Sequence, residues 1–145
     1  MKKFRNSILL IAISFIFCGC PENEEIHRNI AFVNNSDVEI VCQALVSGNI
    51  SEKDTLFHCR TGAVGISSNS QHNFSSLHNS WEIDFEIIPY IQLLVMDSKI
   101  YDNYIAEPCD TIRKYVPILK RYRLTLSDLR QMNWVVEYPS KDKVK

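Results

Sequence analysis

The sequence predicts a mainly β fold: a single small antiparallel β-sandwich with one short helix near the C-terminus. Several segments place apolar residues at alternating positions, which is typical of strands, and Asn, Ser, Gly or Pro residues separate them. A helix start signal is found in one place, near residue 125. The length of 145 residues, with 46% hydrophobic and 23% charged residues, fits one domain with its own core.

The first two predicted strands, residues 30–33 and 38–46, form an antiparallel hairpin in this prediction. The turn signal between them is the sequence Asn34-Asn35-Ser36-Asp37. Alternate residues of the second strand share one face, which we expect to be buried: Val38, Ile40, Cys42, Ala44 and Val46.

The middle of the chain predicts less regular structure. Residues 47–80 are rich in Ser, Asn, Gly and His, which indicates long loops with one or two short strands. Residues 81–88 fit either a strand or a helix, since their apolar positions match both periods, and Pro89 ends either element. Residues 90–96 predict a core strand.

The C-terminal part contains the predicted helix and the last strand. Pro117 lies within an otherwise apolar stretch and indicates an edge strand or a break. Thr125 and Asp128 have the spacing of a capping box, so we expect a short helix ended by Asn133. Its core-facing residues would be Leu126, Leu129 and Met132. With a last strand at 134–138, the elements favour a sandwich of immunoglobulin or transthyretin type.

The N-terminus has the pattern of an export signal. Three basic residues precede an apolar run at 8–17, which is too short for a membrane-spanning helix and ends on Gly19-Cys20. This ending resembles the lipobox of bacterial lipoproteins. The resemblance implies removal of residues 1–19 and attachment of lipid, including palmitate, to Cys20; an ordinary cleaved signal peptide is the alternative.

The residues after Cys20 carry information about location. The sequence Pro21-Glu22-Asn23-Glu24-Glu25 resembles the acidic export signal of Bacteroidetes surface lipoproteins. It implies an outer-membrane protein on the cell surface, with a periplasm-facing structural or assembly role as the alternative. The expected organisation is a signal peptide at 1–19, a flexible tether at 20–29, the sandwich at 30–139 and a disordered basic tail at 140–145.

The C-terminal sequence carries a second resemblance. Leu119-Lys120-Arg121-Tyr122, then Leu124 to Leu129, Asn133-Trp134 and Tyr138-Pro139 are similar to the ending of a group of small Bacteroidetes lipoproteins. Asp110-Thr111-Ile112 and, near the start, Val33-Asn34-Asn35-Ser36-Asp37 are similar to the same group, so the resemblance covers about a third of the mature chain, at its two ends. It implies a location and a fold, and no specific function.

Three cysteines remain after lipid attachment, so an exported domain could form one disulfide bond. Cys42–Cys59 closes the shortest loop, pairings with Cys109 stay open, and Cys42 could instead be a small buried apolar residue. His58, Cys59, His72 and His78 match no zinc spacing, so we expect no metal and no cofactor.

The sequence lacks the common catalytic motifs, and we expect no enzymatic activity. A Cys- or metal-dependent hydrolase is the enzyme alternative. Asp54-Thr55-Leu56 and Asp110-Thr111-Ile112 are similar to the Bacteroidetes O-glycosylation motif. That similarity marks Thr55 and Thr111 as glycosylation candidates, with a turn or helix cap as the alternative at Thr111.

Charge is unevenly distributed along the chain. Residues 20–110 hold 14 acidic and 4 basic side chains, whereas residues 111–145 hold 9 basic and 3 acidic ones. The basic segment either balances the acidic body internally or forms a patch for an anionic partner: Lys120, Arg121, Arg123 and Arg130. The whole chain has a formal charge of −1, which argues against nucleic-acid binding. We therefore expect a non-enzymatic surface module that binds an envelope protein or a glycan.

Overall fold

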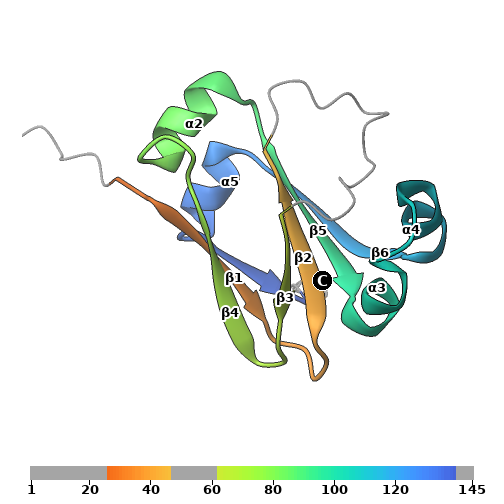
Figure 1. The fold of residues 1–145 in the computed structure, drawn as a ribbon. Helices are drawn as coiled ribbons and strands as arrows, with labels where there is room; N and C mark the ends of the chain where they lie inside the picture. The colour runs from red at the N-terminus through yellow and green to blue at the C-terminus, as the bar shows by residue number, and fades with distance from the viewer. Residues whose placement is uncertain (1–25, 47–61, 140–145) are drawn as a thin grey trace, which may run out of the picture.

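The computed structural model describes residues 26–46 and 62–139, and in these residues the fold is mainly β (Figure 1). The strands are β1 (Asn29–Asn34), β2 (Ile40–Leu45), β3 (Ala63–Ile66), β4 (Ser70–Ser75), β5 (Ile91–Asp97), β6 (Ile118–Leu124) and β7 (Val135–Tyr138). The helices are α2 (Trp81–Ile87), α3 (Ser98–Tyr104), α4 (Cys109–Tyr115) and α5 (Leu126–Gln131). The predicted signal peptide, most of the predicted tether and the predicted basic tail lie outside the described residues.

The strands form two sheets. One has the order β4-β1-β7, with β4 antiparallel and β7 parallel to β1. The other is antiparallel and has the order β3-β2-β5-β6. The strands β3 and β4 are the one or two short strands expected within residues 47–80, although they belong to different sheets.

The predicted hairpin between the first two strands is wrong, because β1 and β2 belong to different sheets. The reason lies in Asn34, whose side chain is fully buried. Its Nδ2 donates to the carbonyl oxygens of Val38, Ile66 and Ser67 at 2.8, 3.1 and 3.0 Å. These bonds hold the turn signal as a corner that carries the chain from one sheet to the other.

One hydrophobic core draws side chains from both sheets. Its largest fully buried members include Phe32 of β1, Ile40 of β2 and Leu93 of β5. The β2 face predicted to be buried joins this core through Ile40 and Cys42, while Val38 is 48% exposed and lies before the strand.

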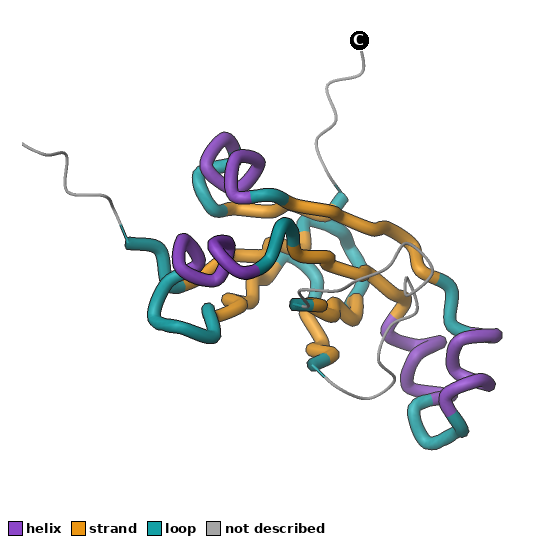
Figure 2. The backbone as a smooth tube through the Cα atoms, turned by 90° about the horizontal axis from the view of Figure 1, so that it is seen from above, coloured by secondary structure: helices purple, strands orange, loops and turns teal. Residues whose placement is uncertain are grey.

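A second core covers the opposite face of the four-stranded sheet. Leu94 and Met96 of β5 pack there with Tyr101 of α3 and with Ile112 of α4. The strand β5 is therefore buried on both faces. The expectation of one short helix is wrong, since four helices lie within the described ranges and two of them cover this face. Figure 2 shows α3 and α4 at one end of the molecule and α2 and α5 at the other.

The ambiguous segment at 81–88 is a helix. The Ser80 hydroxyl accepts from the Ile83 backbone N–H at 3.3 Å, which caps the first turn of α2. Trp81 and Ile88 are buried and Phe85 packs against the same core, as the helical period requires. The local cap and the buried tryptophan therefore select the helix over the strand.

The C-terminal predictions hold with one exception. Thr125 and Asp128 form the expected capping box of α5, and Pro117 separates α4 from the edge strand β6. Asn133 has the expected left-handed conformation, with φ of 50°. Met132, however, is 42% exposed, because Trp134 enters the core in its place. None of the helices within 26–46 and 62–139 has the length and apolarity needed to cross a membrane.

Candidate functional site

Several predicted site residues lie outside the described residues. They are the lipid attachment residue Cys20, the glycosylation candidate Thr55, and the pair His58 and Cys59. Their roles stay predictions.

The proposed Cys42–Cys59 disulfide bond is not formed, because Cys42 is a free cysteine buried in β2. Burial raises the pKa of the Cys42 thiol to about 12. The alternative interpretation, a small apolar core residue, therefore describes Cys42. The disulfide-bonded cysteine of the described chain is Cys109, at the start of α4.

Thr111 lies in the first turn of α4 and is partly exposed. Its backbone N–H donates to the Pro108 carbonyl at 2.9 Å, and Asp110 lies 3.7 Å from Arg113 one turn later. Asp110 and Thr111 thus lie in the first turn of α4, whose N-cap is Pro108, so the expected turn or helix cap at Thr111 is not found. Glycosylation of Thr111 stays a prediction.

The four predicted basic residues lie on two different elements. Lys120, Arg121 and Arg123 lie on β6, whereas Arg130 lies on α5. The Lys120 Nζ lies 5.7 Å from the centroid of the Tyr122 ring, and Arg123 stacks over Tyr90 at 3.8 Å. Two of the four cations thus lie over aromatic rings. In the described part of the chain, Lys120, Arg123 and Arg130 form no ion pair with a carboxylate.

The described histidines of the middle segment, His72 and His78, lie on different elements. His72 on β4 packs edge-on against Phe74, with centroids 4.9 Å apart, and His78 lies before α2. Within 26–46 and 62–139, no three His, Cys, Asp or Glu side chains are grouped as metal ligands.

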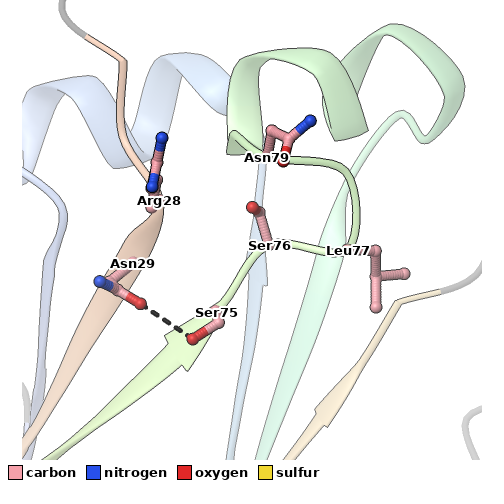
Figure 3. A pocket seen from close by; sticks show the side chains of 6 residues that line it. All are labelled: Arg28, Asn29, Ser75, Ser76, Leu77 and Asn79. Atoms are coloured by element: carbon pink, nitrogen blue, oxygen red, sulfur yellow. Dashed lines mark hydrogen bonds between the residues drawn. The ribbon is translucent and has the colours of Figure 1, made fainter.

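A shallow polar cavity of about 310 Å³ lies where the start of β1 meets the end of β4 (Figure 3). Arg28 and Asn29 line it from the β1 side, and Ser75 Oγ donates to Asn29 Oδ1 at 2.9 Å across the two strands. The remaining lining residues come from the end of β4 and the loop before α2: Ser76, Leu77 and Asn79. We call this cavity the β1–β4 pocket.

His27 fixes one side of the β1–β4 pocket. Its ring stacks on Trp134 with a centroid distance of 4.2 Å, and its Nδ1 lies 2.8 Å from Glu82 Oε1. Its carbonyl accepts from the Trp81 backbone N–H at 2.9 Å. The contacts place Arg28 at a defined position and show that ordered structure begins before Ile30, where the sequence predicted a tether.

Asp84 fixes the other side. This carboxylate is 2% exposed; its Oδ2 accepts from the Leu77 backbone N–H at 2.8 Å, and its Oδ1 lies 2.7 Å from His78 Nδ1. The loop then turns at Asn79, whose φ of 64° lies in the left-handed region that asparagine tolerates. A buried carboxylate thus holds the loop that supplies half of the lining.

Among the described residues, the site combines a cation that has no ion pair with carboxylates that are paired to histidines. Arg28 is the charged residue of the lining, and it has no ion pair within the described ranges. Burial opposes ionisation of Glu82, but hydrogen bonds from His27, Ser80 and backbone amides outweigh it, so the pKa of Glu82 is lowered. The lining therefore offers a guanidinium, two amides and two hydroxyls, which suit a polar ligand held by hydrogen bonds.

Sequence reasoning missed the β1–β4 pocket for a physical reason. Asn29 and Ser75 are brought together by the pairing of β1 with β4, and the predicted hairpin assigned β1 a different partner. One local signal was available. The polar sequence before Trp81 contains Ser80, which could have been recognised as a helix cap and would have placed a turn at Asn79.

Comparison with known proteins gives no match to a family model, to a curated protein or to a solved structure.

Proposed function

We propose that the protein is a lipid-anchored, non-enzymatic binding module of the bacterial outer membrane, exposed on the cell surface. The observation that carries the anchor is the basic and apolar N-terminal sequence that ends on Gly19-Cys20. The distance along the chain supports it: Cys20 is seven residues before His27, whose side chain contacts Trp134 and Glu82 in the described part of the chain. A lipid on Cys20 would thus hold the domain close to a bilayer.

The binding role is supported by the β1–β4 pocket. Its six lining residues offer one guanidinium, two amides and two hydroxyls beside the aliphatic side chain of Leu77, and none of the six has a thiol, carboxylate or imidazole. Such a surface suits recognition of a polar group on a protein or glycan better than covalent chemistry. We also propose that the two sheets, which share one core, form a sandwich of immunoglobulin or transthyretin type.

The anchor is tested by expressing the full chain with Cys20→Ala. We expect loss of acyl labelling and release of the chain from the membrane fraction, with Cys18→Ala as the matched control that retains both. Continued labelling of Cys20→Ala contradicts the assignment. Protease treatment of intact cells tests location: cleavage without lysis supports surface exposure, and protection until lysis supports the periplasm-facing alternative.

A further inference from the structure

We propose that the exposed side of α2 docks onto the lipid bilayer to which Cys20 is anchored. Four large aliphatic side chains at this end of the molecule are open to solvent: Ile26 (68%), Leu77 (67%), Ile83 (43%) and Ile87 (67%). We call these four residues the α2 face. The inference rests on the proposed lipid anchor and adds a second, apolar contact with the same membrane.

Contacts with α2 bring the four residues to one end of the molecule. Ile26 precedes His27, which binds both Glu82 and the backbone of the first helical turn. Leu77 reaches the helix from the other side, through its N–H bond to Asp84. Figure 1 shows α2 at the end of the fold where the N-terminal segment enters β1.

The side chains on α2 itself divide by helical period. Trp81 and Ile88 point into the core, whereas Ile83 and Ile87 lie one turn apart on the exposed side. Single exposed aliphatic residues are common on soluble proteins. Here two lie side by side on a short helix, and one flanks each side of it. A helix with this division can lie in the interface with its apolar side about 5–10 Å into the headgroup and acyl boundary.

The length of the connecting chain brings this end to the membrane. Ile26 is the sixth residue after Cys20, so a fully extended connection between them spans at most about 20 Å. The helices α3 and α4 lie at the opposite end of the molecule (Figure 2). A lipid on Cys20 therefore keeps the α2 face within reach of the bilayer surface. Because this second contact is then intramolecular, weak apolar contacts suffice for docking.

Charge selects the type of lipid surface. Glu86 is on the exposed side of α2, and the connecting chain carries Glu22, Glu24 and Glu25. These carboxylates disfavour a strongly anionic bilayer. Arg28, at the same end, can donate to the phosphate group of a zwitterionic headgroup. The expected surface is therefore a bilayer of phosphatidylethanolamine and phosphatidylcholine.

The experiment uses the lipidated protein with Ile87→Trp, reconstituted in vesicles of these two lipids with brominated acyl chains. The native Trp81 and Trp134 are 1% and 7% exposed. Their emission is measured on the parent protein and subtracted from the emission of the variant. We expect the added tryptophan to emit at shorter wavelength than in detergent-free buffer and to be quenched by bromine. Leu119→Trp is the matched control: Leu119 is 46% exposed on β6, outside the α2 face, and we expect no quenching there.

The outcomes separate this inference from the proposed anchor. The mass of the N-terminal peptide reports acylation of Cys20 independently of the fluorescence. Acylated protein whose added tryptophan is not quenched overturns the inference and leaves the anchor intact. If the added tryptophan emits at shorter wavelength without being quenched, and crosslinking on the vesicle gives a species of twice the protein mass, the α2 face contacts a second copy of the chain. That result also overturns the inference. Ile83→Trp is measured in parallel, so that a folding defect of one variant does not decide the result.

Discussion

The second core makes a measurable prediction about β5. A sandwich in which one face of each sheet meets solvent would leave every other residue of this strand exposed. In the structure Leu93 and Leu94, which point to opposite faces, are both fully buried. Truncation of either side chain should therefore destabilise the fold, and Leu94→Ala is the informative variant.

The magnitude follows from the surroundings of Leu94. The residue pairs with Gln43 of β2 and Arg121 of β6, in the middle of the four-stranded sheet, and it packs in the core shared with α3 and α4. Removing a fully buried leucine side chain costs about 2–5 kcal/mol, from lost burial and the cavity left behind. Leu119→Ala, at an exposed position of β6, should change the free energy of unfolding by no more than about 0.5 kcal/mol.

The assay is urea unfolding of the soluble Cys20→Ala chain lacking residues 1–19, followed by circular dichroism. Leu93→Ala serves as the positive control, because its core is shared by both sheets. We expect the variants at 93 and 94 to lose similar stability at an unchanged denaturant slope. A value for Leu94→Ala close to that for Leu119→Ala would refute the second core and the packing of α3 and α4 onto the sheet.

Three further predictions concern local features. Thr125→Ala should lower the free energy of unfolding by about 1 kcal/mol through loss of the capping box, against little change for Ser127→Ala, both measured by urea unfolding. The folded-state pKa of Glu82 is lowered, so its contribution to stability is present above its ordinary pKa of about 4.3 and is lost as pH falls through the folded value. The stability difference between the parent and Glu82→Gln should accordingly shrink on acidification, as urea unfolding at a series of pH values would measure. Cys42 should resist alkylation at pH 8 in the native state and react after unfolding, as peptide mass spectrometry would report; rapid native labelling contradicts its burial.

The elements that could be predicted from the sequence are those determined by local chemistry. The capping box at Thr125 and Asp128 is formed, the break at Pro117 separates helix from strand, and Asn133 ends its helix in the left-handed region. Each depends on residues within a few positions of one another, where backbone restriction and hydrogen bonding decide the conformation. The strand β5 was also predictable, because Ile91, Leu93 and Val95 alternate along it on one side.

The pairing of strands was not predictable in the same way. The turn after Asn34 has the composition of a hairpin turn, yet it is a corner, because the Asn34 amide bonds carbonyls at Val38 and Ile66. The hydrogen bond from Asn34 to the Ile66 carbonyl spans 32 residues of sequence, and no residue near Asn34 in the sequence indicates it. The helix α3 was missed for a related reason: its cap is Asp97, whose side chain accepts from the Ile100 N–H, and the same Asp97 ends a strand. The residues of the β1–β4 pocket are brought together by the pairing of β1 with β4, so the pocket could not be predicted without knowing that pairing.

The first and last strands of the described chain, β1 and β7, are paired, and this pairing determines how the domain would resist a pull on the proposed lipid anchor. β1 follows directly from the segment that would carry the lipid, and it is the central strand of its sheet, bonded to β4 on one side and to β7 on the other. Trp134, at the start of β7, has φ of 61°, an unusual conformation for a bulky residue, and its ring stacks on His27. Its carbonyl accepts from the Ala31 N–H at 2.9 Å. With a lipid on Cys20, tension on the connecting chain would therefore be resisted by hydrogen bonds on both edges of β1 and by the His27–Trp134 stack. The same contacts hold Arg28 in place. The strand β1, which would carry this load, therefore also lines the β1–β4 pocket.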